Sequence, residues 1–366
     1  MRALVSIAWF SSLTLLLSAC EGCEVDPLGH VPEPGAVAGR VCDPSDDHQG
    51  IYGARVFVVL SFGDGSEEEL VAVTDADGTF LLEEVPPGTY TVYVERGSFR
   101  TELPDVSVEE AQVTELDPSS CLAPDTVTMT VFEGHDSVDE VLTRLGYTDF
   151  TLVPTYHRVQ DRDDTTPSWI VEAFSDYDAF GHNDILFINC GPHEWALERA
   201  SDEELAVAFE NLRRFVVEGG SIYLSDWSYD LLEALYPDAV DWLGDDLVWN
   251  DAEHGLQQYF VGDVLDADIA GVLGLERAAL RYEQSRIAVP LSLGSGARPL
   301  ITADIDVEDE LGDPMSLTDV PVLLEYRPPS LADRADPGRI IYTTFHNGAA
   351  NTPDMDEVLR AIIFAL

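Results

Sequence analysis

The chain has 366 residues, with 69 acidic and 19 basic side chains and a formal net charge of −50. Its hydrophobic share of 45% and charged share of 24% are ordinary for a globular protein, which excludes wholesale disorder. All the basic side chains are arginine, and so negative a field excludes a nucleic-acid partner. The acidic residues are spread along both halves of the chain, which favours a solvated surface; calcium sites between carboxylates are the alternative.

The first twenty residues have the pattern of a bacterial export signal. Arg2 precedes a mostly apolar stretch, residues 4–17, that is too short to span a bilayer comfortably. The run Leu17-Ser18-Ala19-Cys20 resembles the bacterial lipobox, in which the cysteine is acylated and becomes the mature N-terminus. The resemblance predicts a signal peptide over residues 1–19 and a membrane anchor at Cys20; an ordinary secretory signal is the alternative.

The residue after this cysteine is Glu21, not aspartate, which favours the outer over the inner membrane of the cell envelope. Residues 20–34 are rich in proline, glycine and acids, and they are predicted to form a tether.

Residues 35–122 are predicted to form an all-β sandwich, because short alternating apolar runs recur between turn signals. Asp75-Ala76-Asp77-Gly78 supplies a glycine that can take positive φ, and Pro86-Pro87-Gly88 supplies a second turn. The carboxylates of Asp75 and Asp77 suit a turn better than a calcium site. The strands are expected at residues 37–41, 54–60, 70–73, 79–82 and 90–94.

This segment resembles the carboxypeptidase regulatory-like domain, a transthyretin-like sandwich close to the collagen-adhesin B repeat. The resemblance rests on Gly39-Arg40-Val41, Gly53-Ala54-Arg55-Val56 and the stretches 74–80 and 85–94. It implies a spacer, stalk or binding platform without catalysis. Cys42 and Cys121 lie near the two ends of the segment and are the candidate disulfide, with Cys23 as a competing partner.

Residues 123–366 alternate between strand and helix patterns, which predicts an α/β domain with a doubly wound parallel sheet of the flavodoxin-like kind. Asp136 is expected to cap a helix that ends at Gly146, and Ser201 with Glu204 forms a capping box. Residues 237–319 resist assignment and are expected to hold most of the insertions. The predicted strands cover 127–132, 150–153, 184–189, 222–224, 320–326 and 339–345.

The second segment is similar to the class I glutamine amidotransferase-like superfamily, and within it to the trehalose-utilisation-like members. A helix ending in Phe215-Val216 and Gly219-Gly220 precedes the strand that carries the nucleophile elbow in that family, and a final strand ends in His346. The family chemistry needs a thiolate at the elbow and an acid two residues after the histidine. This chain has Ser225-Asp226-Trp227 at the elbow and Gly348 after His346, so glutamine hydrolysis is not expected.

Three alternatives remain for a crevice around Cys190, Ser225, Asp226 and His346. Cys190 could be a nucleophile activated by His193 or His346, or a small buried residue. Ser225 with His346 is a second nucleophile option, although the G-x-S-x-G elbow is absent. A divalent metal on Asp226, His346 and His193 or Glu194 is the third; otherwise no cofactor is indicated.

Together these patterns predict a cell-envelope lipoprotein with a β-sandwich stalk and a degenerate amidotransferase-like domain. The domain is expected to bind a ligand or partner, with a saccharide or an envelope protein as candidates, and to lack catalysis. The alternative is a surface hydrolase, metal-assisted or not, that acts on saccharide-related substrates at the same crevice.

Overall fold

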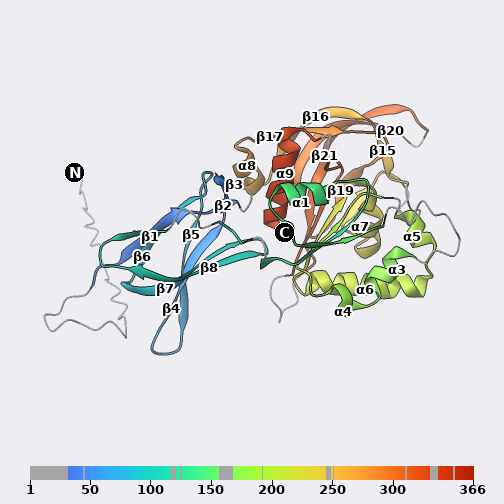
Figure 1. Ribbon diagram of the computed structural model, residues 1–366. Coiled ribbons are helices and arrows are strands. Elements are labelled where there is room, and N and C mark those ends of the chain that lie inside the picture. Colours follow the sequence, from blue (N-terminus) through green and yellow to red (C-terminus); the bar gives the residue numbers. More distant parts are fainter. Residues whose placement is uncertain are drawn as a thin grey trace, which may run out of the picture.

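The computed structural model describes residues 32–43, 46–116, 121–123, 126–155, 168–191, 193–244, 249, 251–309, 311–329, 337–348 and 351–366. The predicted signal peptide, Cys20, Cys23 and most of the predicted tether lie outside these residues. In Figure 1 an elongated β body adjoins a larger α/β body.

The N-terminal body is a sandwich of a four-stranded sheet, β5-β4-β7-β8, and a three-stranded sheet, β6-β1-β9. Valine and leucine side chains from both sheets, including Val37, Val56, Leu82 and Val92, fill its core. The strands are β1 (Gly35–Arg40), β2 (Cys42–Asp43), β3 (Asp46–Gly50), β4 (Arg55–Ser61), β5 (Glu67–Val73), β6 (Thr79–Val85), β7 (Gly88–Arg96), β8 (Phe99–Val108) and β9 (Val113–Glu115).

The predicted turns of the sandwich are present. Gly78 has a φ of +77°, and a Cβ there would lie 2.3 Å from the carbonyl oxygen of Val41, so only glycine fits. Strand β8 has no counterpart in the sequence prediction, because Pro104 and several acids disguise it. Proline is tolerated there since β8 is the edge strand of its sheet.

The larger body contains a mixed sheet in which the neighbouring strands β11-β10-β12-β13-β22 run parallel. These strands are β10 (Met129–Phe132), β11 (Phe150–Val153), β12 (Ile185–Ile188), β13 (Ser221–Ser225) and β22 (Ile340–Thr343). All four residues of β12 are buried, as a strand covered on both faces requires. The purely parallel sheet that the sequence suggested is extended by antiparallel strands beyond β22.

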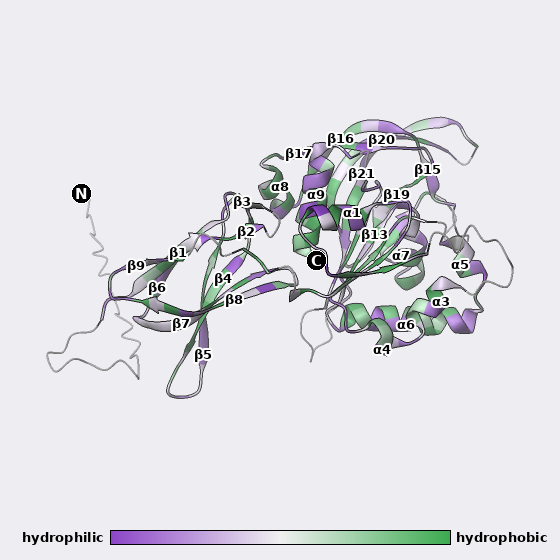
Figure 2. Ribbon diagram, in the orientation of Figure 1, coloured by the Kyte–Doolittle hydropathy of each residue, from purple (hydrophilic) through white to green (hydrophobic). Residues whose placement is uncertain are grey.

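Helices cover both faces of the parallel strands, and Figure 2 shows hydrophobic residues along these strands and on the helices packed against them. Helices α1 (Val138–Arg144) and α9 (Pro353–Ala365) contribute to the core on one face. The other face packs against α3 (Trp169–Phe174), α4 (Tyr177–Phe180), α5 (Glu194–Glu198), α6 (Asp202–Val217) and α7 (Tyr229–Leu235). The Ser201–Glu204 capping box opens α6 as predicted.

Residues 237–319, which the sequence left unassigned, form most of the antiparallel extension. The elements of this region are β14 (Val240–Trp242), β15 (Glu253–Gly255), β16 (Gln258–Val264), α8 (Ala267–Leu273), β17 (Arg277–Tyr282), β18 (Ile287–Ala288), β19 (Pro290–Leu293), β20 (Ala297–Glu308) and β21 (Pro314–Tyr326). Strands β14 and β19 pair with each other in a separate two-stranded sheet. The extension brings the backbone of Ala288 beside the end of β13.

The two bodies share a packed interface and one continuous hydrophobic core. Phe99 of β8 packs against Tyr147 and Phe364, with ring centroids 5.2 and 5.5 Å apart. The buried Arg360 of α9 lies 3.8 Å from the buried carboxylate of Asp43 in the sandwich.

The predicted disulfide between Cys42 and Cys121 is confirmed. It joins β2, not the first strand, to the segment that leads into the α/β body. Among the described helices, none has the length and apolar character needed to cross a membrane.

Candidate functional site

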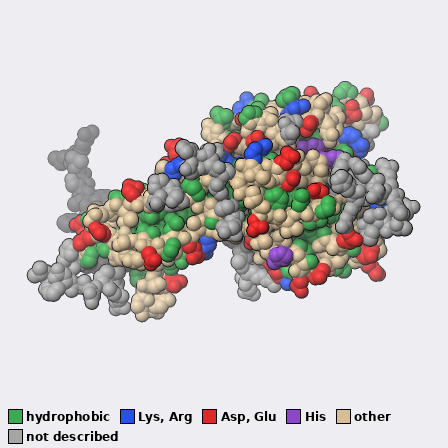
Figure 3. Space-filling model, in the orientation of Figure 1, with side chains coloured by type: hydrophobic (Ala, Val, Ile, Leu, Met, Phe, Trp, Pro, Cys, Tyr) green, Lys and Arg blue, Asp and Glu red, His purple; other side chains and the backbone are tan. Residues whose placement is uncertain are grey.

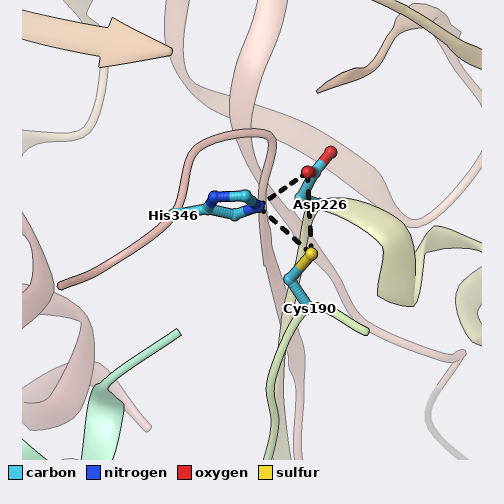
Figure 4. A group of neighbouring side chains, drawn as sticks. All are labelled: Cys190, Asp226 and His346. Atoms are coloured by element: carbon cyan, nitrogen blue, oxygen red, sulfur yellow. Dashed lines mark hydrogen bonds and ion pairs between the residues drawn. The ribbon is translucent and has the colours of Figure 1, made fainter. Parts of the chain in front are cut away.

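Three side chains from distant parts of the sequence meet at one edge of the sheet. Cys190 follows β12, Asp226 follows β13 and His346 follows β22, and these three strands are neighbours. The carboxyl ends of parallel strands share one edge, which is where open α/β sheets bind ligands. Figure 4 shows the three side chains pointing toward one another.

The cluster is held by short polar contacts. Nε2 of His346 lies 2.8 Å from Oδ2 of Asp226 and 3.1 Å from Sγ of Cys190. The thiol donates to the same carboxylate oxygen over 3.7 Å. The side chain of Asp226 is fully buried and that of His346 is 10% exposed, so the imidazole marks the open side of the cluster.

Asp226 sits in a strained backbone conformation directly after β13. Its φ of +41° lies in the left-handed region that residues other than glycine rarely adopt. Oδ1 accepts a hydrogen bond from the backbone N–H of Ala288, and its carbonyl oxygen accepts one from the hydroxyl of Tyr342. These bonds hold the elbow and leave Oδ2 directed at His346.

Beneath the cluster, Ser225 and Asp136 form a second polar layer. The hydroxyl of Ser225 donates to Asp136 and accepts from the backbone N–H of Cys190. Asp136 also accepts from the backbone N–H of Asn347. The Ser225 hydroxyl is therefore hydrogen-bonded to a carboxylate. Among the described residues, the side chain of His346 bonds Cys190 and Asp226 rather than Ser225, so the structure does not support Ser225 as a nucleophile activated by His346.

Burial and charge set the protonation of these groups. Burial, reinforced by the carboxylates of Asp226 and Asp136, raises the pKa of the Cys190 thiol well above its usual value. Burial lowers the pKa of His346, but the two carboxylates outweigh it and raise that pKa to about 9. At neutral pH the imidazole of His346 is thus protonated and the thiol of Cys190 is un-ionised, and an un-ionised thiol is a poor nucleophile.

His193, which the sequence offered as a partner of Cys190, serves a different part of the structure. Its Nε2 contacts the carbonyl oxygen of Asn189 and the hydroxyl of Ser228. Burial lowers its pKa to about 4, so it is neutral at pH 7. The side chain of Glu194 lies outside the described part of the chain.

Sequence reasoning brought Cys190, Ser225, Asp226 and His346 to one crevice but gave Asp136 the wrong role. The N-cap of α1 is Ser137, which makes no side-chain cap hydrogen bond. Asp136 instead turns inward and is buried. Its position just beyond the first parallel strand was the signal, because polar residues at that point face the shared edge of the sheet.

The predicted turn role of Asp75 in the sandwich agrees with its hydrogen bonds. Its carboxylate accepts bonds from the backbone N–H groups of Asp77 and Thr79 and from the hydroxyl of Thr79. Both carboxylate oxygens are therefore used by the turn itself.

A family comparison supports the assignment of the sandwich. Residues 36–119 match the model of the carboxypeptidase regulatory-like domain. The carboxypeptidase regulatory-like sandwich therefore precedes the α/β body that carries the Cys190–Asp226–His346 cluster. A search of curated proteins finds no match.

Solved structures with some likeness to the chain include three of different kinds. The mmIFT52 N-terminal domain is 12% identical over 65% of this chain and 95% of its own, with a TM-score of 0.37. A type II cohesin–X-dockerin complex from Acetivibrio cellulolyticus is 25% identical over 22% of this chain and 51% of that one, with a TM-score of 0.16. BcpA, the major pilin subunit of Bacillus cereus, is 15% identical over 23% and 29%, with a TM-score of 0.18.

Proposed function

We propose that this protein is a lipid-anchored component of the bacterial cell envelope, and that its α/β body is an amidotransferase-like domain that binds a ligand without hydrolysing glutamine. The observation that carries the second half is Asp226: the elbow position holds a strained, buried carboxylate bonded to His346 where a thiolate would be required. A saccharide or an envelope protein remains the candidate ligand, and the outer membrane the candidate location.

Strand order supports an amidotransferase-like fold of the flavodoxin-like class. Numbered along the chain, the five parallel strands follow the order 2-1-3-4-5 across the sheet. Gly219, with a φ of +110°, ends α6 before β13, and the positive φ of Asp226 follows directly after β13. A strained residue at the end of such a strand is the geometry of a nucleophile elbow.

The side chains at this elbow argue against acyl transfer. A carboxylate replaces the thiol, Gly348 stands where the orienting acid belongs, and Cys190 lies on the neighbouring strand with an un-ionised sulfur. The pKa of His346 is raised to about 9, so its imidazole is already protonated at neutral pH and is not poised as a general base.

The absence of glutaminase activity is tested by measuring ammonia release from glutamine, and product release from a simple ester, with the purified mature chain. The expected rate equals that of the His346→Ala variant in both assays. Turnover that depends on His346 would overturn the non-catalytic assignment.

Ligand binding is tested by thermal unfolding of the same protein with a panel of neutral and acidic oligosaccharides. A ligand at the crevice is expected to raise the unfolding temperature of the native chain but not of His346→Ala, because binding to the folded state stabilises it. His182→Ala, an exposed histidine on a loop, is the matched control. A panel that shifts all three proteins equally would contradict binding at this crevice.

A surface hydrolase is the second candidate, favoured by the convergence of Cys190, Asp226 and His346 on one point. It predicts saccharide-ester or amide hydrolysis that appears only with an added divalent ion and is lost in Asp226→Asn. Equal rates with the ion and with a chelator would remove this candidate.

The anchor is tested separately by expressing the full chain and the Cys20→Ser variant in a bacterial host. Fractionation is expected to move the variant from the membrane to the soluble fraction, because its acyl chains are lost. An unchanged distribution would contradict anchoring at Cys20 without affecting the ligand-binding proposal.

A further inference from the structure

The Cys190–Asp226–His346 cluster differs from an ordinary buried ion pair because a thiol shares it. A thiol sulfur, an imidazole nitrogen and a carboxylate oxygen all lie within 4.8 Å of one another. Each of these atoms is a known ligand of first-row transition metals. A histidine–aspartate pair is stable without a sulfur beside it, so the pair by itself does not explain why the thiol of Cys190 is present.

We propose that Cys190, Asp226 and His346 form a three-ligand site for a divalent ion such as zinc. The fourth coordination position is open on the solvent side of the cluster, where His346 is partly exposed. The proposal adds a metal ion to the crevice of the proposed function and rests on that crevice being a binding site; it is independent of the lipid anchor.

The observed distances are close to those of a tetrahedral site. Zinc bonds of about 2.3 Å to sulfur and about 2.0–2.2 Å to nitrogen and oxygen imply separations of about 3.3–3.6 Å between ligand atoms. The corresponding separations here are 2.8, 3.1 and 3.7 Å. Two of the three contacts need to lengthen by about half an ångström, which small side-chain rotations supply.

The ligand atoms are oriented by bonds that leave them free for a metal. Oδ1 of Asp226 is taken by the N–H of Ala288, so Oδ2 remains as a single donor. The backbone N–H of Cys190 is tied to Ser225, which is tied in turn to Asp136. Such outer hydrogen bonds fix ligand direction in known metal sites.

Two carboxyl groups lie at the cluster. One is Asp226 itself, and the other is the buried Asp136, which accepts a hydrogen bond from Ser225 beneath the cluster. A divalent ion would replace the imidazolium proton and the thiol proton and leave a neutral imidazole and a thiolate as ligands.

The donor set selects the kind of metal. Calcium and magnesium prefer oxygen alone, whereas one sulfur, one nitrogen and one oxygen suit zinc or a similar borderline ion. Three protein ligands with an open fourth position are typical of zinc sites that bind a water or a substrate, since purely structural sites use four.

The side chains near the open position fit a site that receives a ligand. His346 is partly exposed, and the rings of His135 and Trp227 lie 5.7 Å apart near it.

The test uses the mature chain purified without chelator, then stripped and reloaded. Metal analysis is expected to find one zinc per chain, and cobalt is expected to give tetrahedral visible bands with a sulfur-to-metal charge-transfer band. Competition with a chromophoric chelator is expected to show a loss of affinity in Cys190→Ser, Asp226→Asn and His346→Gln that exceeds the roughly 100-fold effect of losing an outer hydrogen bond.

Two matched controls separate this site from adventitious binding by so acidic a protein. Cys23→Ser removes a cysteine of the predicted tether, and His182→Gln removes an exposed imidazole. Both variants are expected to keep the cobalt spectrum and the affinity. Circular dichroism checks that every variant is folded before metal is added.

The proposal is overturned if cobalt gives no sulfur charge-transfer band, or if Cys190→Ser and Cys23→Ser have the same affinity. It is also overturned if folded native protein shows no rise in unfolding temperature on addition of zinc. An oligosaccharide that still binds at His346 after the metal test has failed would leave the proposed function standing.

Discussion

At the scale of single residues, Asp226 shows how this site is held under strain. A positive φ at a residue with a side chain costs on the order of 1–3 kcal/mol, and the surrounding contacts must offset it. Here the offset comes from the N–H of Ala288, the hydroxyl of Tyr342 and the imidazole of His346. The chemistry of the elbow and its backbone geometry therefore depend on one another.

Replacing Asp226 by asparagine tests this coupling in the metal-free protein. The change keeps the size of the side chain but removes the charge that His346 faces. We expect the free energy of unfolding at pH 7 to fall by about 1.5–3 kcal/mol, the usual contribution of a hydrogen bond to a charged group. Urea unfolding measures this change in the free energy of unfolding, and Asp178→Asn, on exposed helix surface, is the control. An equal loss of stability in both variants would contradict the coupling between the Asp226 side chain and its backbone conformation.

His193 predicts a pH dependence of stability that is independent of the cluster. Its pKa in the folded protein is lowered to about 4 from an ordinary value near 6.5. The unfolded chain takes up a proton first as the pH falls, so this contribution is full above pH 6.5 and is lost between about pH 6.5 and pH 4. We expect a loss of about 3 kcal/mol over that window.

The measurement is urea unfolding at several pH values for the native chain and for His193→Gln. Acidic groups contribute to both proteins, so the difference between the two curves reports His193. Parallel curves would show that His193 is not the group concerned.

At the scale of elements, the end of each parallel strand decides what lies in the site. Strands β10, β12, β13 and β22 are followed by Asp136, Cys190, Asp226 and His346, respectively. The sequence identifies these strands by their apolar runs, and the turns that follow them by glycine and polar residues. It assigned Asp136 to a helix cap because a polar residue before an apolar helix fits both roles equally well.

The capping box of α6 gives a prediction at this scale. Ser201 accepts from the backbone N–H of Glu204, and Glu204 accepts from the N–H of Ser201. We expect Ser201→Ala to lower the free energy of unfolding by about 1 kcal/mol, because one N–H at the start of the helix loses its partner. Urea unfolding is the measurement, and Ser175→Ala, at an exposed helix end, is expected to change it little.

At the scale of the whole molecule, the carboxypeptidase regulatory-like sandwich and the α/β body share one hydrophobic core. Figure 3 shows acidic side chains dispersed over both bodies on the face in view. Mutual repulsion among these charges opposes compaction, so the interface must be held by packing. Phe99, Tyr147 and Phe364 supply it, and Ser98 donates a hydrogen bond to the carbonyl oxygen of Leu366.

Truncation of Phe99 is expected to weaken both bodies together. The side chain is fully buried at their junction, and phenylalanine-to-alanine changes in cores cost about 3–5 kcal/mol. We expect Phe99→Ala to lower the unfolding temperature. We also expect the transition followed by tryptophan fluorescence, which reports on the α/β body, to coincide with the transition followed by far-ultraviolet circular dichroism. Loss of the sandwich signal alone would show that the two bodies unfold independently.

The disulfide contributes through the unfolded chain. Cys42 and Cys121 are 79 residues apart, and closing a loop of that length in the unfolded chain stabilises the folded protein by about 4.5 kcal/mol. We expect the double variant Cys42→Ser/Cys121→Ser to lose stability of that order in urea unfolding. Native protein treated with a reductant provides a second measurement of the same loss. A urea midpoint unchanged in both the double variant and the reduced protein would contradict the expected contribution of the disulfide.

The amino-acid sequence by itself determined most local elements outside β8 and residues 237–319, because apolar periodicity, capping residues and turn glycines act over a few positions. It also gave the candidate disulfide between Cys42 and Cys121, which the structure confirms. Only the tertiary structure decided that Cys190 and His346, 156 positions apart, lie in contact, and that Asp136 belongs beneath them. The reason is physical: strand order and helix packing bring these side chains together, and no short-range pattern encodes which strand ends become neighbours.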